Sequence, residues 1–293
     1  MQRDYINAKP VLDAMLERNS VRTFLDRPIP DEVLDHILDV SIQAASGGCL
    51  QAYSIIVIKD SERKKKLCEA CGGQKFVETA AVDLVYCLDW HKYDIYNKMK
   101  KAPLVAHRAF SHFIITAQDI MCAAQSAETA AHLCGIGSCY VGSILGKADQ
   151  MKEELNLPKY VYPMTVLSLG YQKNDGTPRR KHMSRDMMVF DEKYPELDEN
   201  SLYEAFEEKL QGMRMPLPKK DPARSRMLDT MKKSLLTTYS EEETEAIIAE
   251  IIEKGEFNET QRRFGLHYAA CYMVQNGRET IEDMRKCGIV IDD

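Results

Sequence analysis

Apolar residues follow two different periods along the first 195 residues of the chain. Residues 53–60 (YSIIVIKD) and 81–90 (AVDLVYCLDW) are nearly continuous apolar runs, which predict strands covered on both faces. Two further strand patterns occur at 137–144 and 161–172, with a short helix between them near 150–155. Helical and strand patterns are intermixed throughout, so this part is predicted to build α and β elements around one central sheet.

Helical spacing of apolar residues predicts several helices around these strands. The first is opened by Pro10 and ends near Asn19, and a second begins after Pro30 and ends at Gly47-Gly48. A lysine-rich helix separates the first two strands. A long helix is predicted from Val105 to Cys134, with a stripe of small residues that permits close helix contact, either in the core or at a subunit seam.

The pattern changes from Leu197 onward. LYEAFEEKLQGM is helical, MPLPKKDP is a proline-bearing linker, and three further helical patterns run to the C-terminus. Residues 201–293 are therefore predicted to form a helical extension that packs on the preceding domain or on a dimer partner.

Composition and charge narrow the class of protein. The chain has 293 residues, is 44% apolar and carries a formal net charge of −6, which gives no electrostatic reason to expect nucleic acid or an anionic membrane as a partner. We see neither an uninterrupted apolar run of membrane-spanning length nor a secretory signal. Nine cysteines, an odd number in a chain of this length, do not indicate a disulfide framework. A cytoplasmic protein is expected.

The stretch RNSVRTF, residues 18–24, is a candidate anion site. Two guanidinium groups, a serine hydroxyl and backbone amides at a turn suit a phosphate, because charge-assisted hydrogen bonds survive competition from water. Surface arginines facing Glu17 and Asp26 explain the same residues equally well. A second basic cluster, QKNDGTPRRKHMSRD at 172–186, has five basic residues against two acidic ones and is either a solvated loop or a second arm on the same phosphate.

Three glycine-bearing segments are further candidates. Gly47-Gly48 either closes a helix or lets a flat ligand approach the backbone beside Ser46. The amide of Gln74, after Gly72-Gly73, can donate to and accept from a heterocycle. The segment GIGSCYVGS (135–143) is not a dinucleotide-binding loop, because its glycines do not follow GxGxxG and it precedes a strand, but glycines at this spacing can still let a ligand approach the main chain closely.

No catalytic or metal site is legible in the sequence. Cys68 and Cys71 have the spacing of a zinc or redox pair, but neither a second CxxC nor a suitable histidine pair completes a metal site. A thiol-redox role for the two cysteines remains open. No Ser-His-Asp, Cys-His or paired-carboxylate arrangement stands out, which favours a protein whose cofactor performs the chemistry.

Taken in order, the motifs RNSVRTF, ASGGCLQAYSIIVI, CGGQKFV, GIGSCYVGS and LGYQKNDGTPRRK followed by DEKYPELD resemble the FMN-dependent nitroreductase family, in particular its NADPH-dependent oxygen-insensitive nitroreductase and flavin reductase branch. The likeness spans residues 10–200. It implies an α+β fold: a mixed, mainly antiparallel sheet flanked by helices, in an intertwined homodimer with FMN at each end of the subunit seam. Residues 1–200 would be the FMN-binding domain.

The resemblance also implies site residues, all of them cofactor-binding and none catalytic or metal-ligating. The FMN phosphate and ribityl chain would be bound by Arg18, Asn19, Ser20 and Arg22, with Arg179 or Arg180 from the late phosphate loop. Ser46 would reach FMN, often from the partner subunit, and Gln74 would bond the ribityl chain or the ring edge. The backbone facing the flavin ring would be Tyr140, Val141, Gly142 and Ser143. Asn19, Gly47-Gly48 and Thr177 depart from the family pattern.

The implied activity is that of an oxidoreductase. It would take hydride from NADPH or NADH and reduce a nitroaromatic, quinone or flavin acceptor by a ping-pong mechanism. A protein of another class, which binds or senses flavin without catalysis and covers the flavin face with its tail, is the alternative. The sequence does not identify the preferred nicotinamide or the physiological electron acceptor.

Overall fold

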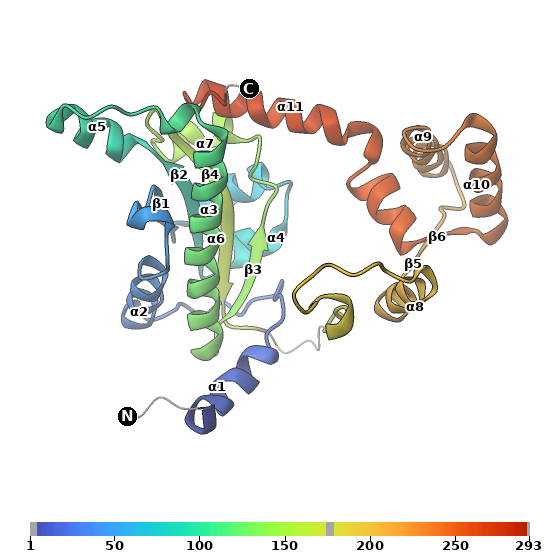
Figure 1. Ribbon diagram of the computed structural model, residues 1–293, viewed down its shortest axis with the longest axis horizontal. Coiled ribbons are helices and arrows are strands. Elements are labelled where there is room, and N and C mark those ends of the chain that lie inside the picture. Colours follow the sequence, from blue (N-terminus) through green and yellow to red (C-terminus); the bar gives the residue numbers. More distant parts are fainter. Residues whose placement is uncertain (1–4, 174–178, 292–293) are drawn as a thin grey trace. The chain divides into compact units, whose positions relative to one another are not determined.

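The computed structural model describes residues 5–173 and 179–291 (Figure 1). The chain divides into two compact units, one formed by Met1–Pro178 with Glu279–Asp293 and the other by Arg179–Arg278. Within the described residues, none of the helices combines the length and the apolar character needed to cross a bilayer.

The first unit is built on a four-stranded sheet in the order β1-β2-β4-β3. All three neighbouring pairs are antiparallel. An isolated bridge from Ser20 to Ser138 adds a parallel neighbour beside β3. The mixed, mainly antiparallel sheet is thus confirmed, and the strands are β1 (Tyr53–Ile58), β2 (Val82–Asp89), β3 (Gly137–Val141) and β4 (Val161–Gly170).

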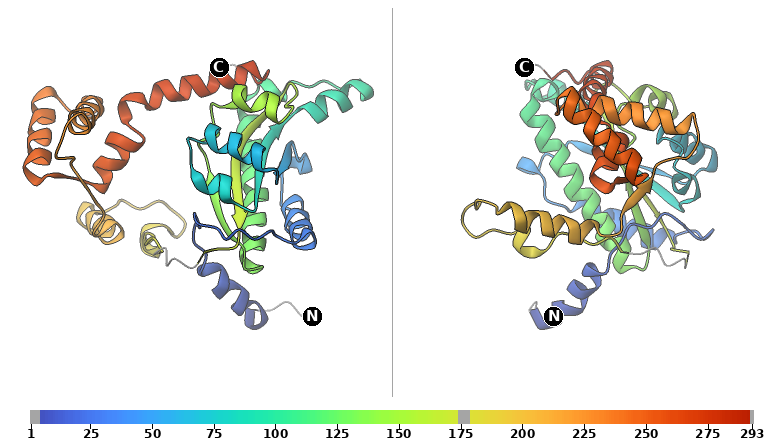
Figure 2. Two further views of the ribbon diagram at one scale, coloured as in Figure 1. Left: turned by 180° about the vertical axis from the view of Figure 1, so that it is seen from behind. Right: turned by 90° about the vertical axis from the view of Figure 1, so that its right-hand side faces the viewer.

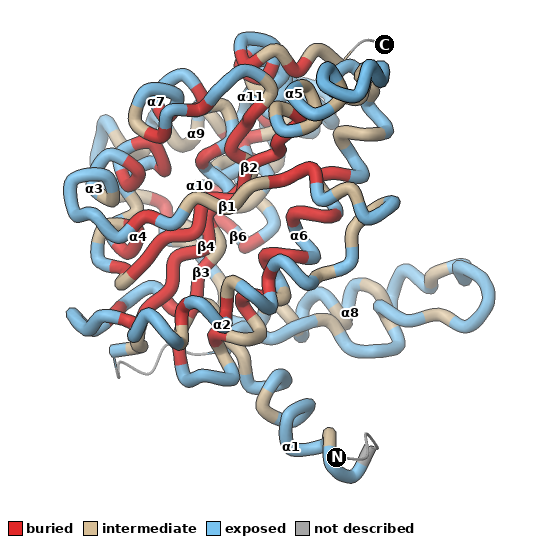
Figure 3. The backbone as a smooth tube through the Cα atoms, turned by 90° about the vertical axis from the view of Figure 1, so that its left-hand side faces the viewer, coloured by how far each residue is buried: buried red, intermediate tan, exposed pale blue. Residues whose placement is uncertain are grey.

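Helices cover both faces of this sheet, which is why its strands read as continuous apolar runs. Helices α2 (Asp31–Ile42) and α6 (Phe110–Leu133) pack on one face, as α6 crossing the sheet in Figure 1 shows. Helices α3 (Ser61–Ala70), α4 (Lys75–Thr79) and α7 (Ala148–Glu154) belong to the other side, where Figure 2 shows α3 and α4 from behind. All eight residues of β2 are buried, and buried positions run along the neighbouring strands in Figure 3.

Two helix boundaries differ from the predicted ones. Pro10 does not open the first helix but lies inside α1 (Tyr5–Leu16), which therefore lacks one backbone hydrogen bond at that residue. Helix α2 ends at Ile42 rather than at the glycine pair, because the chain turns there and Gly47–Cys49 forms a separate 3-10 turn with Gly48 at φ 58°.

The predicted long helix is also shorter than expected, because α6 begins at Phe110 after a 3-10 turn at Ala106–Arg108. Helix α5 (His91–Lys100) precedes it. The predicted helices between β1 and β2 and between β3 and β4 are confirmed as α3 and α7.

The second unit is helical with one small two-stranded antiparallel sheet. Its helices are α8 (Glu199–Leu210), α9 (Ala223–Leu235), α10 (Glu241–Lys254), a π-helix at Gln261–His267 and the first part of α11 (Ala270–Lys286). A capping box between Ser240 and Glu243 begins α10. The prediction that MPLPKKDP is a linker is in part wrong, because its first two residues belong to β5 (Arg214–Pro216), which pairs with β6 (Glu256–Asn258).

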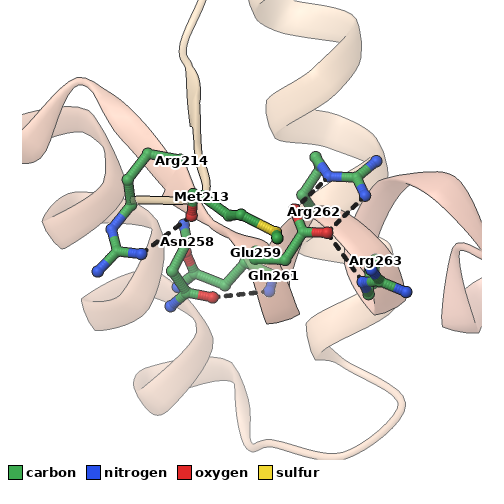
Figure 4. A network of polar contacts seen from close by, with 7 residues as sticks. All are labelled: Met213, Arg214, Asn258, Glu259, Gln261, Arg262 and Arg263. Carbon is green, nitrogen blue, oxygen red and sulfur yellow. Dashed lines mark hydrogen bonds and ion pairs between the residues drawn. The ribbon is translucent and has the colours of Figure 1, made fainter. Parts of the chain in front are cut away.

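A buried carboxylate organises the chain after β6 (Figure 4). Glu259 is 5% exposed and accepts hydrogen bonds from Arg262 Nε at 2.6 Å, Arg262 Nη2 at 2.7 Å and Arg263 Nε at 2.8 Å. Bonding to Arg262 lowers the pKa of Glu259 to about 2. This contribution to stability is complete above the ordinary glutamate pKa and is lost as the pH falls towards 2.

The end of the chain returns to the first unit. Met284, Cys287 and Ile289 are buried in the core that also contains α2 and α6, and Asp283 accepts a hydrogen bond from Ala148 N at 2.9 Å. The predicted extension therefore contributes its last residues to the sheet-bearing unit. The functional division at residue 200 stays a prediction.

Candidate flavin site

The stretch RNSVRTF runs along the free edge of β3. Val21 N donates to Ser138 O at 2.8 Å, next to the Ser20–Ser138 bridge. A Cβ on Gly137 would lie 2.7 Å from Val21 Cγ2, so glycine is required for this close approach. Gly137 thus lets the segment around Val21 pack closely against β3, and this contact places the arginine segment at the edge of the sheet.

Arg18 has a partner that the sequence did not suggest. Its Nη1 lies 2.8 Å from Oε1 of Glu128 on α6, and the Glu128 side chain is 1% exposed. The same carboxylate accepts hydrogen bonds from Ser138 Oγ at 3.1 Å and Gln125 Nε2 at 2.7 Å. The interpretation of Arg18 as a surface residue facing Glu17 or Asp26 is therefore wrong.

Arg22 is exposed, and its guanidinium carbon lies 6.0 Å from the ring centre of Phe76. Within 5–173 and 179–291 it forms no ion pair with a carboxylate, so Asp26 is not its partner either. Both arginines influence Cys139 on β3: burial raises the pKa of its thiol, while the charges of Arg22 and Arg18 act to lower it. The two guanidinium groups therefore lie near the same strand.

Gln74 forms a hydrogen bond with Ser143, just after the C-terminal end of β3. Its Nε2 donates to Cys71 O at 3.1 Å and to Ser143 Oγ at 2.9 Å, and Ser143 Oγ donates to the same Cys71 carbonyl at 2.9 Å. A carbonyl oxygen can only accept, so the amide nitrogen must face Cys71. Among the described residues no group donates to Oε1 of Gln74, which can therefore accept a hydrogen bond from a ligand.

The residues after the strand leave the backbone accessible. Gly142 and Ser143 are exposed, and a Cβ built on Gly142 would meet no atom within 4 Å. Val141 is buried, and the Tyr140 hydroxyl is buried without a hydrogen-bond partner among the described residues. An open stretch of main chain beside an acceptor and a cation fits a flat, anionic ligand such as FMN.

The structure therefore brings most of the predicted residues to one strand, but not all of them. Ser46 lines a separate cavity of ≈ 520 Å³ together with Trp90, His112 and Asp119. Beside it, Gly47 N donates to Asp119 Oδ1 at 2.8 Å, and a Cβ on Gly47 would lie 2.5 Å from Ile115 Cγ2. The resemblance assigns Ser46 to the flavin of a partner subunit, and that assignment stays a prediction.

The late phosphate loop belongs to another part of the chain. Arg179 and Arg180 begin the second unit, where both are exposed. Thr177, predicted to replace a loop lysine, lies outside the described residues. A shared phosphate between this loop and Arg22 stays a prediction.

The sequence reasoning missed Glu128, Ser138 and Phe76. One signal was available for Glu128: it follows Ala124 and Ala127 on the stripe of small residues that we predicted to be packed, and a buried carboxylate requires a partner. The partner itself, 110 residues earlier in the chain, had no local signal.

Cys68 and Cys71 are both buried and not disulfide-bonded. Burial raises the pKa of Cys68 and raises the pKa of Cys71 to about 12. Because the thiolate is the reactive form, this environment disfavours thiol chemistry.

Comparisons with known proteins identify the family of the chain. The nitroreductase family model matches residues 15–171, which is more than half of the chain. An NAD(P)H-dependent FMN reductase of Bacillus subtilis is 28% identical over 202 residues, covering 68% of this chain and 81% of the relative. The oxygen-insensitive NADPH nitroreductase of Salmonella typhimurium is 29% identical over 193 residues, covering 66% and 78%.

Among solved structures, the hypothetical oxidoreductase YcnD from Bacillus subtilis matches with a TM-score of 0.72 and 22% identity, covering 97% of this chain and 99% of that one. This match supports the fold alone. The family resemblance of the ordered motifs is confirmed by the match over residues 15–171, and the chain belongs to the nitroreductase family.

Proposed function

We propose that this protein is an FMN-dependent oxidoreductase that takes hydride from NADPH or NADH and reduces a nitroaromatic, quinone or flavin acceptor. The observation that supports it most is the meeting of three separate segments around β3. Arg22 follows Val21, which bonds to Ser138 of the strand; Gln74 bonds to Ser143; and the backbone at Gly142 is open. The relatives named as FMN reductase and NADPH nitroreductase support the same reaction class.

The residues of the chain would hold and orient the cofactor. Arg22 would bind the phosphate, with Arg18, Asn19 and Ser20 beside it, and Gln74 Oε1 would accept a hydrogen bond from the ribityl chain or the ring. The main chain from Tyr140 to Ser143 would face the ring. Bound FMN would supply the redox chemistry, accepting hydride from the nicotinamide and delivering electrons to the second substrate after the nicotinamide has left.

The absorption spectrum tests this proposal. Protein purified without added flavin, or incubated with FMN and desalted, is expected to show a bound-flavin spectrum. NADPH or NADH is expected to bleach it without oxygen, and a nitroaromatic or quinone is expected to restore it. A protein that stays colourless with excess FMN would contradict the site. A flavin that dithionite bleaches and neither nicotinamide does would contradict the reductase and favour the non-catalytic alternative.

We also propose a cytoplasmic homodimer. Apolar side chains are exposed on two helices of the first unit: on α1, Ile6, Val11, Leu12, Met15 and Leu16, and on α6, Phe110, Ile114, Ile115 and Met121. So many exposed apolar residues are unusual for a monomer, and they suit an interface with a second copy.

Sedimentation equilibrium is expected to give about twice the chain mass of 33.4 kDa. Replacing Leu12 and Leu16 on α1 by glutamate is expected to shift the protein towards monomer. The matched control replaces Glu17, which is exposed on the turn after the same helix, by lysine. A wild-type protein that stays monomeric at micromolar concentration would contradict the assembly.

A further inference from the structure

The two arginines of RNSVR lie in different electrostatic surroundings. The Arg18 side chain is 34% exposed and is paired with the carboxylate of Glu128, which is almost completely buried. Arg22 is exposed, and the described chain offers it no ion-pair partner, only the face of Phe76 at 6.0 Å. The two arginines look equivalent in the sequence, but only Arg18 has a carboxylate beside it to balance its charge.

The environment of Glu128 fixes both its position and that of Arg18. Three donors surround the carboxylate: Arg18 and Ser138 on Oε1, and Gln125 on Oε2. Ser138 is also the residue whose carbonyl accepts from Val21, between the two arginines. Glu128 thus ties α6 to the arginine segment and to the first residues of β3.

We propose that Glu128 is a positioning residue that neutralises Arg18, so that Arg22 supplies the net positive charge that attracts the cofactor phosphate. Arg18 then adds little net charge at the phosphate, because the carboxylate of Glu128 balances it. This inference rests on the proposed function, because it concerns the phosphate of the same flavin. It assigns phosphate selectivity, meaning the preference for FMN over riboflavin, mainly to one arginine.

The surroundings of β3 agree with such a division. Arg22 is the strongest of the charges that lower the pKa of Cys139, whereas Glu128 opposes Arg18 there. Burial raises the pKa of Tyr140, and there too the charge of Glu128 acts against that of Arg18. At both side chains the pair Arg18–Glu128 works as two opposing charges.

The test replaces Glu128 by glutamine and measures binding of FMN and of riboflavin by fluorescence titration. Glutamine keeps an oxygen for Arg18 and Ser138. The amide nitrogen of the new glutamine faces Gln125, which is exposed and can turn its own amide so that its oxygen accepts the hydrogen bond. Riboflavin lacks only the phosphate, so the ratio of the two affinities isolates the phosphate contact and does not depend on turnover.

In Glu128→Gln, the ratio of FMN to riboflavin affinity is expected to rise about threefold at low salt and to return towards the wild-type value in high salt, because a negative charge near the phosphate is removed. In Arg22→Gln, the ratio is expected to fall about tenfold. A purely structural role for Glu128 predicts the opposite sign, a weaker hold on FMN. A ratio that falls or stays constant in Glu128→Gln would overturn the proposal.

The double variant Arg18→Gln with Glu128→Gln keeps the test decisive if the single variant does not fold. It removes the ion pair as a unit, so the ratio is expected to stay within about twofold of wild type. A loss as large as that of Arg22→Gln would overturn the proposal. If neither flavin binds to the wild-type protein, the proposed function fails instead, so the two failures are distinguishable.

Discussion

Replacing Arg18 by alanine is expected to lower the free energy of unfolding of the first unit by about 3 kcal/mol. The Glu128 carboxylate, 1% exposed, would lose its only cationic partner among the described residues and keep only the neutral donors Ser138 and Gln125. The cost arises from leaving a charge buried without compensation rather than from the value of the ion pair itself. Urea unfolding followed by the fluorescence of Trp90, the single tryptophan of the chain and a buried residue, measures it.

Arg22→Ala is the matched control, because it removes the same side chain from an exposed position in the same segment. Its expected cost is below about 1 kcal/mol. Arg18→Ala combined with Glu128→Gln is expected to recover most of the lost stability, because no buried charge remains. Equal losses in the two single variants would show that the Arg18–Glu128 pair has no special role.

The pH dependence of stability is expected to be dominated by Asp83. This side chain on β2 is fully buried; Ser168 Oγ donates to its Oδ1 at 2.5 Å, and Oδ2 has no partner among the described residues. Burial raises the pKa of Asp83 to about 7. Below about pH 4 both the folded and the unfolded chain keep the proton, and between about pH 4 and 7 only the unfolded chain releases it.

The free energy of unfolding therefore falls as the pH rises through this window, and above pH 7 it is about 4 kcal/mol lower than below pH 4. Asp83→Asn cannot ionise, so its stability relative to wild type is expected to improve by roughly that amount between pH 4 and 8. Trp90 fluorescence in urea at several pH values gives the two curves. Ser168→Ala keeps the titrating carboxyl and is expected to retain the wild-type trend. Parallel curves for Asp83→Asn and wild type would show that Asp83 is not the group responsible.

The candidate site was predictable as a set of motifs but not as an arrangement. RNSVRTF, Gln74 and the residues 140–143 carry recognisable chemistry in the sequence, and the structure places them along one strand. Their internal partners were not predictable, because Glu128 and Ser138 are separated from Arg18 by more than a hundred residues and lie in segments that read as ordinary helix and strand. Gly137 shows the same difficulty: its close neighbour is Val21 of the chain itself.

The sequence by itself determined the strands, most helices, the order of the motifs and the membership of a family, because local periodicity and residue chemistry are carried by short stretches. Tertiary structure alone decided the strand order β1-β2-β4-β3, the return of Met284 and Ile289 to the first core, and the pairing of Arg18 with Glu128. Each of these features depends on contacts between segments that are distant in the sequence. The strand order, for example, cannot be read from the apolar runs, because a strand covered by helices on both faces has the same continuous apolar pattern in a parallel and in an antiparallel sheet. The contribution of a charged side chain to stability likewise depends on its burial and on its partner, which only the folded structure reveals.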